Sequence, residues 1–268
     1  MKKKFKFGVM GAGFMSSAII KGIINEGFIA PGEIIVSDIS AEQLNKIAKL
    51  GVQTTLDNKI LADNAEFVLF AVKPQNLQEV LIDIKDCSCI KFISIMAGVK
   101  KEKIKSVLPK AIVARCMPNT PCSIGLGAVG LDLSDYLDDN DIKFIKGIFS
   151  SFASVEIVSE DKLNAVTGVS GSSPAYFYLF LKGIIDAGVK QGLTEETAKS
   201  LAVSTMIGAG KMVLENPEKS LDDLIKAVCS KGGTTIEAIN VYMDNNLGLI
   251  TETAINACVK RAKELENL

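Results

Sequence analysis

KFGVMGAGFMSSA, residues 6–18, joins a short apolar run to a glycine-marked turn and the start of an apolar helix. Residues 7–10 predict a buried strand, and Gly11, Gly13 and Ser16 fill the three positions of the pattern G-x-G-x-x-G/A. Backbone N–H groups at the start of a helix can receive the negative charge of a pyrophosphate. Because the pattern stands between a strand and a helix, it predicts a dinucleotide-binding site.

The residues of this turn have distinct expected roles. Gly11 permits the tight turn, Gly13 has no Cβ to keep phosphates away from the backbone, and Ser16 is small enough for the helix to pack closely on the strand. Phe14 and Met15 lie in the same turn, and we assign them to the cofactor site as well. The sequence therefore predicts that a Rossmann-type α/β domain begins here.

The composition excludes several classes of function. The chain has 268 residues, a length that favours two domains over one, and 48% of the residues are hydrophobic, which is ample for burial. Thirty basic residues against 31 acidic residues produce no field that would attract nucleic acid or an anionic membrane. No apolar run approaches the length of a membrane span, and because Lys6 and Gly8 interrupt the apolar residues after the first lysines we expect no secretory leader. We expect a cytoplasmic protein without a nucleic-acid or membrane partner.

The six cysteines form no C-x-x-C pair, and the chain contains no histidine. Reduced thiols in a cytosolic protein are the favoured interpretation, and no metal site is expected. Histidine is also the commonest catalytic acid or base, so any mechanism here must proceed without imidazole.

Asp38 follows the second predicted strand, residues 33–36, about twenty residues beyond the glycine turn. An acidic residue at this place accepts hydrogen bonds from the adenosine ribose and repels a 2′-phosphate, so Asp38 favours NADH over NADPH. The alternative is that Asp38 or Ser40 caps the predicted helix 41–50, and the two roles are compatible.

Three further apolar strands are predicted at residues 66–72, 92–96 and 112–116, and each ends in residues suited to a ligand. Small Ala97 and Gly98 would let a planar ring approach the backbone, and the two prolines of residues 117–121 predict an extended, rigid loop that could hold a nicotinamide. Ligands of open α/β sheets bind at the carboxyl edge, where these strands end. Lys73 follows the strand 66–72, and the alternative to a cofactor contact there is a lysine that is exposed to solvent. The cofactor-binding residues expected at this edge are Ala71, Val72, Lys73, Pro74, Ala97, Gly98, Met117, Pro118 and Asn119.

From residue 160 onward the pattern is helical, so we expect a dinucleotide-binding domain at 1–159 and a helical domain at 160–268. A second Gly-Ala-Gly, residues 208–210, lies in a helical stretch with no strand before it and predicts a small-residue packing face. The apolar helix faces exceed what a helix hairpin could bury alone. We therefore expect at least a homodimer formed through this helical domain.

A second glycine turn, AVCSKGGTTIEAI at residues 227–239, lies within the helical half. A helix predicted from Ile236 would place an anion-binding N-terminus here, with added hydroxyl groups. A small-carboxylate or phosphate site and a simple capping loop both remain open on these residues alone. The candidate binding residues are Ser230, Gly232, Gly233, Thr234 and Thr235.

Several segments together resemble one family, the Δ1-pyrroline-5-carboxylate reductases. They are GAGFMSSA, AVKPQ at 71–75, MAG at 96–98, RCMPNTP at 115–121, TGVSGSSPAYFY at 167–178, SKGGTT at 230–235 and the terminal helix containing ACVKRAKEL. These segments occur in the family's order and span essentially the whole chain.

The resemblance implies reduction of a cyclic imine, pyrroline-5-carboxylate, to L-proline with NADPH or NADH. It places the substrate carboxylate on the N–H groups of Gly232, Gly233 and Thr234, with help from Ser230. Thr235 matches the family's hydroxyl beside the ring nitrogen and is the expected catalytic residue. A protonated imine is already electrophilic, so positioning and charge complementarity can supply much of the catalysis.

The chain departs from the family at three places. Lys231 stands where the family usually has proline, Ser173 replaces a glycine, and Leu247-Gly248 replaces Phe-Arg. The competing hypotheses are a related imine or hydroxy-acid reductase and a non-catalytic nucleotide-sensing scaffold. The hydroxy-acid enzymes need a lysine on the long helix, where this chain offers only Lys182, expected at the surface.

Overall fold

The computed structural model describes residues 3–135 and 137–266. The chain separates into two compact units. Unit 1 comprises the residues up to Pro174 together with those from Cys258 onward, and unit 2 comprises Ala175–Ala257. Each unit is described by itself below.

The described part of unit 1 contains an eight-stranded sheet in the order β3-β2-β1-β4-β5-β6-β7-β8. All neighbouring strands are parallel except β6 and β7, which are antiparallel. The strands are β1 (Phe5–Met10), β2 (Ile34–Ser37), β3 (Gln53–Thr55), β4 (Ala65–Phe70), β5 (Lys91–Ser94), β6 (Ile112–Pro118), β7 (Gly127–Asp132) and β8 (Ala153–Ile157).

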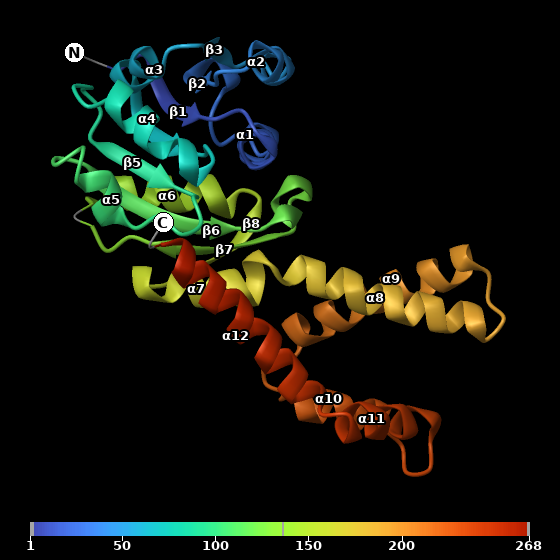
Figure 1. The fold of residues 1–268 in the computed structure, drawn as a ribbon. Coiled ribbons are helices and arrows are strands. Elements are labelled where there is room, and N and C mark those ends of the chain that lie inside the picture. Colours follow the sequence, from blue (N-terminus) through green and yellow to red (C-terminus); the bar gives the residue numbers. More distant parts are fainter. Residues whose placement is uncertain (1–2, 136, 267–268) are drawn as a thin grey trace. The chain divides into compact units, whose positions relative to one another are not determined.

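Helices cover both faces of this sheet, each face with its own apolar core (Figure 1). One core includes side chains of α1 (Phe14–Asn25), α2 (Ala41–Ala48) and α6 (Asp139–Ser150). The other includes side chains of α3 (Asn58–Asn64), α4 (Leu77–Asp83) and α5 (Lys101–Lys105). The prediction of a Rossmann-type domain is confirmed, because a doubly covered, mostly parallel sheet is the defining feature of that fold.

The predicted strand ends differ from the observed ones mainly around β6. The sequence predicts an extended loop from Met117 to Pro121, whereas β6 continues through Pro118 and a 3₁₀ turn follows at Thr120–Ile124. Pro118 lies opposite Val129 at the last pair of the antiparallel ladder. Proline has no N–H to donate, and a strand end is a place where that loss is tolerated.

A buried ionic cluster lies beside β6 and β7. The Lys101 ammonium is within 2.7 Å of Asp132 and 3.3 Å of Asp135, and Asp135 also pairs with Lys105 at 2.5 Å. Burial works against the charge of Lys101, but the hydrogen bond and charge of Asp132 raise its pKa. Burial likewise opposes the charge of Asp135, but the Lys105 hydrogen bond and the Val113 N–H lower its pKa. Both charges are thus stabilised by partners that satisfy them.

Unit 2 consists of helices that bury little of their own apolar surface. Within its described residues only Ala198 and Ala202 are buried hydrophobics, while Leu179 is 73% exposed and Met243 69% exposed. α8 begins at Ser173, with Pro174 in its first turn. The helices are α8 (Ser173–Lys190), α9 (Glu195–Glu215), α10 (Leu221–Val228), α11 (Thr234–Asp244) and the first part of α12 (Leu247–Leu265). No helix among the described residues is long and apolar enough to cross a membrane.

Candidate functional site

The glycine turn between β1 and α1 has the geometry that its sequence pattern predicts. Gly11 adopts φ +100°, and a Cβ there would lie 2.7 Å from the Ala71 carbonyl oxygen, so only glycine fits. Gly13 is the N-cap of α1, and a Cβ there would enter open space. Space next to free N–H groups is what a phosphate requires. Ser16 is 1% exposed and its Oγ has no hydrogen-bond partner among the described residues.

Asp38 lies at the end of β2 and is tied to the glycine turn. Its Oδ2 accepts the Ala12 N–H at 2.7 Å, and its Oδ1 accepts the Ser40 N–H at 2.8 Å. The N-cap of α2 is Ser40, whose Oγ accepts the Gln43 N–H, so Ser40 fills the capping role that the sequence left open between Asp38 and Ser40. The Asp38 carboxylate is thereby held at the turn and lines the cleft described next.

A cleft of about 380 Å³ lies at this carboxyl edge. It unites Gly11, Gly13, Asp38, Ala71, Val72 and Lys73 from the sequence prediction. Among the other lining residues, Asn58 accepts the Ser37 hydroxyl at 2.7 Å and donates to Asp83 Oδ2 at 3.2 Å. The carboxylates of Asp38, Glu79 and Asp83 line the cleft, whereas Lys73 supplies the one ammonium among its lining residues. This excess of negative charge disfavours the 2′-phosphate of NADPH. The residues that sequence reasoning missed are Ser37, Ile39, Ser40, Asn58, Asn76, Glu79, Val80 and Asp83.

One of the missed residues, Asn58, has a signal in the sequence that could have found it. Asn58 comes soon after the short β3, and strands of a parallel sheet end at one common edge. Glu79 and Asp83 lie one helical turn apart on α4, but which face of α4 borders the cleft depends on packing.

The two loops expected near the nicotinamide lie outside this cleft. Gly98 adopts φ +70°, and a Cβ there would lie 2.8 Å from Leu265 Cβ. A side chain at position 98 would thus clash with the last turn of α12. This steric reason for glycine comes in addition to the predicted approach of a planar ring. The Asn119 side chain accepts the Ala128 N–H at 2.9 Å and donates to the Ser170 carbonyl at 3.2 Å. Its amide is therefore engaged within the protein.

The second glycine turn joins α10 to α11 in unit 2. The helix begins at Thr234, two residues earlier than predicted, with Gly233 as its N-cap. Gly232 adopts φ +71°, which favours glycine, and a Cβ on Gly233 would lie 3.1 Å from the Ser230 carbonyl oxygen, so the turn accommodates small residues at both positions. Thr234 and Thr235 are the first two helical residues and are exposed. The first N–H groups of a helix have no partner within it, so they are available to an anion.

Lys182 is exposed on α8 and pairs with Asp186 one turn away. The prediction that it lies at the helix surface is confirmed. An exposed lysine in a solvated ion pair lacks the desolvation that adapts a lysine to acid or base catalysis.

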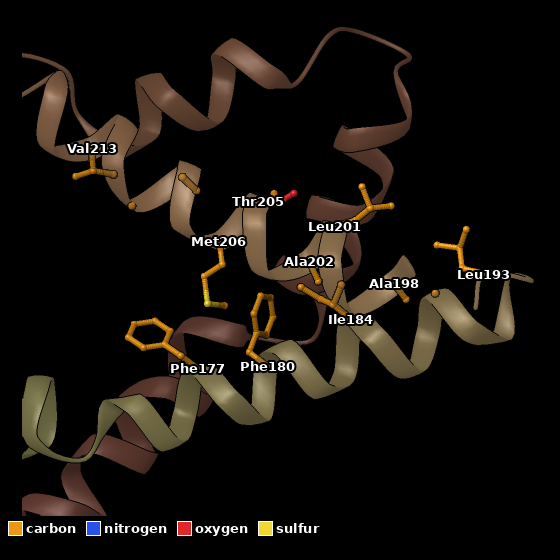
Figure 2. Close-up of a pocket in the computed structure, with 13 residues that line it drawn as sticks. Phe177, Phe180, Ile184, Leu193, Ala198, Leu201, Ala202, Thr205, Met206 and Val213 are labelled. Carbon is orange, nitrogen blue, oxygen red and sulfur yellow. The ribbon is translucent and has the colours of Figure 1, made fainter. Parts of the chain in front are cut away.

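A second, apolar hollow lies within unit 2 and has a volume of about 780 Å³. Figure 2 shows Phe177 and Phe180 of α8 opposite Met206 of α9, with Leu201 and Val213 on either side of Met206 along α9. Gly210 and Ala209 of the predicted small-residue face also line it. The residues that line this hollow include no titratable group that could act on a substrate. Such an apolar surface is suited to packing against another apolar surface.

Comparison with protein families gives two matches. Residues 160–265 match the model described as pyrroline-5-carboxylate reductase dimerisation. Residues 6–98 match the model described as NADP oxidoreductase, coenzyme F420-dependent. The first match supports self-association through the helical part of the chain.

Individual proteins agree with these matches over nearly the full length. A pyrroline-5-carboxylate reductase of Haemophilus influenzae is 39% identical over 264 residues, which cover 97% of each chain. The structure of a pyrroline-5-carboxylate reductase from Coxiella burnetii has a TM-score of 0.90 at 36% identity and covers 98% of this chain and 99% of that one. The Plasmodium falciparum pyrroline carboxylate reductase with NADP bound has a TM-score of 0.88 at 29% identity, over 99% of this chain and 100% of that one.

Proposed function

Because the chain belongs to the pyrroline-5-carboxylate reductase family, we propose that it reduces 1-pyrroline-5-carboxylate to L-proline with NADPH or NADH, the last step of proline biosynthesis. The observation that carries the proposal is 39% identity over 97% of the chain to a protein of that name. The two glycine turns support it, since one suits a dinucleotide and the other suits a carboxylate.

For the substrate, we assign the carboxylate to the start of α11. The N–H groups of Gly232, Gly233 and Thr234 and the Ser230 hydroxyl would hold it, and the positive end of the helix dipole favours its charge. Lys231 adds an exposed ammonium in the same turn. Thr235 would place its hydroxyl beside the ring nitrogen, where it orients the protonated imine for attack on the neighbouring carbon.

For the cofactor, the residues at the carboxyl edge of the sheet fit a dinucleotide. Gly13 leaves the space that a phosphate fills, and Asp38 offers its carboxylate to the adenosine ribose. When bound, the reduced nicotinamide supplies the hydride that the imine carbon accepts. Ala97, Gly98, Met117, Pro118 and the backbone of Asn119 would hold its ring. The Plasmodium relative was solved with NADP, whereas the acidic cleft here leads us to propose that this chain favours NADH.

For assembly and location, we propose that residues 1–159 bind the cofactor and that residues 160–268 bind the substrate and form at least a homodimer. The matched dimerisation model covers 160–265, and the exposed apolar side chains of unit 2 are of the kind that a second copy would bury. All six cysteines are free thiols, which agrees with a cytoplasmic site of action.

The test is an absorbance assay at the reduced-nicotinamide band with purified protein and pyrroline-5-carboxylate, run in parallel with NADH and NADPH. Cofactor oxidation with an equal amount of proline formed would establish the activity and rank the two cofactors. If neither cofactor is oxidised although both bind, the proposal fails. Turnover of another imine or of a hydroxy acid would then assign a related reductase, and its absence would favour a nucleotide-sensing scaffold.

A further inference from the structure

The loop between β5 and α5, residues 95–100, has few hydrogen bonds of its own. The Ile95 N–H reaches the Phe70 carbonyl at 3.2 Å and the Met96 N–H reaches Ser94 Oγ at 3.4 Å. Ala97 and Gly98 form a turn, and among the described residues no backbone N–H of residues 97–100 donates to an element outside the loop. A loop with so few bonds needs packing from another element to keep one conformation.

The last turn of α12 supplies that packing. The Cβ position of Gly98 lies 2.8 Å from Leu265 Cβ and 3.1 Å from the Leu265 carbonyl carbon. Gly98 is buried although it lies in a loop and carries no side chain. The end of the helix therefore lies directly against the backbone of the loop.

Glu266 makes a second contact between the chain end and this loop. Its Oε2 is 3.4 Å from the Lys100 ammonium, and its Oε1 accepts the Asn164 amide at 3.0 Å. The Glu266 side chain is only 10% exposed, whereas Lys100 is 53% exposed. The ion pair itself is weak because Lys100 is solvated, but loss of Glu266 would remove the partner of Asn164, which is 7% exposed.

The other end of the loop is fixed from within the sheet domain. The Lys101 N–H donates to Glu160 Oε1 at 2.9 Å, and the same oxygen accepts Arg115 Nη1 at 2.8 Å. Arg115 is 2% exposed, so this arrangement is buried and well defined. The loop is thus anchored at Lys101 by a hydrogen bond, and the end of α12 contacts it at Gly98 and Lys100.

We propose that the last turn of α12, through Leu265 and Glu266, is a positioning element for the 95–100 loop and thereby for the nicotinamide end of the cofactor. The inference rests on the proposed function, which places Ala97 and Gly98 beside the nicotinamide. The adenosine end has its own cleft around Asp38 and Asn58, and none of the residues that line this cleft belongs to α12. The two ends of the cofactor should therefore respond differently when α12 is shortened.

The experiment measures binding of NADH and of ADP-ribose, which lacks the nicotinamide, to a chain ending at Glu264. A chain ending at Glu266, which loses only residues 267–268, is the matched control. We expect the Kd for NADH to rise about 5- to 20-fold in the shorter chain, because a loop that is no longer held in one conformation must be ordered when the cofactor binds. The Kd for ADP-ribose should stay within about twofold in both chains.

Glu266→Ala and Glu266→Gln give a second readout if the shortened chain folds poorly. The alanine variant removes the acceptor of the Asn164 amide and the partner of Lys100, so it should weaken NADH alone, whereas the glutamine variant keeps an acceptor for Asn164 and should retain the wild-type Kd. Unchanged NADH binding, or equal weakening of NADH and ADP-ribose, would overturn the positioning role. These binding measurements contain no imine, so they do not depend on turnover. Failure of the wild type to reduce pyrroline-5-carboxylate would refute the proposed function, but the comparison of NADH with ADP-ribose would still test the role of α12.

Discussion

Unit 1 buries its large apolar side chains, whereas unit 2 leaves most of its own exposed. Phe7, Phe67 and Phe70 in the sheet are at most 1% exposed, while Phe177 and Leu201 in the helices are 55% and 57% exposed. Both units are helix-rich and similarly apolar in sequence, so the difference is one of architecture. A sheet covered on two faces forms a core within one chain, but a few long helices need a further surface to cover them. The match to a dimerisation family supports a second copy in that place.

The largest effect should come from a charge placed on the apolar hollow of unit 2. Leu201→Asp would bury an unpaired carboxylate in the expected dimer interface, which costs about 3 kcal/mol or more. We expect monomers in light scattering coupled to size exclusion, with helicity by circular dichroism unchanged. Lys199→Glu on the same helix is the control and should leave the mass of the assembly unaltered. A Leu201→Asp protein with wild-type mass would contradict the role assigned to this hollow.

Gly11→Ala should be the most damaging single change at the glycine turn of unit 1. The residue has φ +100° and its new Cβ would lie 2.7 Å from a backbone oxygen, so we expect a loss of about 2–3 kcal/mol in unfolding free energy and of NADH binding. Gly13→Ala is the matched comparison. Its Cβ enters open space, so stability should hold while NADH affinity falls about 10-fold. Equal stability of the two variants in denaturant titrations would refute this distinction.

Thr235→Ala tests the exposed turn of unit 2 in the same way. The side chain is exposed, so the melting temperature should not change, and kcat should fall about 10- to 100-fold if the hydroxyl orients the imine. Steady-state kinetics with pyrroline-5-carboxylate give the answer, and Thr234→Ala, one residue earlier, serves as the control because its expected contact is made by its backbone. Wild-type kcat in Thr235→Ala would remove Thr235 from the mechanism.

Asp38→Ala should alter the choice of cofactor without altering the fold. Loss of the carboxylate removes the repulsion of a 2′-phosphate and the acceptor for the ribose hydroxyls, so the ratio of kcat/KM for NADH over NADPH should fall about 10-fold. Asp86→Asn, an exposed acid on unit 1 that does not line the cleft, is the control. An unchanged ratio would show that Asp38 only holds the Ala12 and Ser40 N–H groups.

The smallest expected effect concerns the buried ionic cluster of unit 1. The pKa of Asp135 is lowered, so its stabilising contribution is present above its ordinary value of 3.8 and is lost as the pH falls through the folded-state pKa. The pKa of Lys101 is raised, so its contribution is present below its ordinary value of 10.5 and is lost as the pH rises through the folded-state pKa. Denaturant titrations from pH 3 to 7 should show a shallower acid decline in Asp135→Asn than in the wild type. An identical slope would show that Asp135 contributes nothing to acid unfolding.

Much of unit 1 was predictable because its signals are local. The order of apolar runs, the Gly11 and Gly13 pattern and the acid at Asp38 depend on neighbours within one strand–turn–helix unit. The strand ends were less predictable. β6 extends through Pro118 because the antiparallel β7 offers a terminal ladder position, and that partner is remote in sequence. The acidic wall of the cleft, with Asp83 bonded to Asn58, depends in the same way on the packing of α3 beside α4.

The sequence by itself determined the fold class, the two glycine turns and the family, because backbone freedom, apolar periodicity and charge are properties of short segments. Only the tertiary structure decided why Gly98 must lack a side chain, since Leu265 follows it by more than 160 residues and reaches it only in the folded chain. It also decided that the Asn119 side chain forms hydrogen bonds with the Ala128 N–H and the Ser170 carbonyl. Contacts between distant segments follow from how elements pack, and no local pattern of residues encodes that packing.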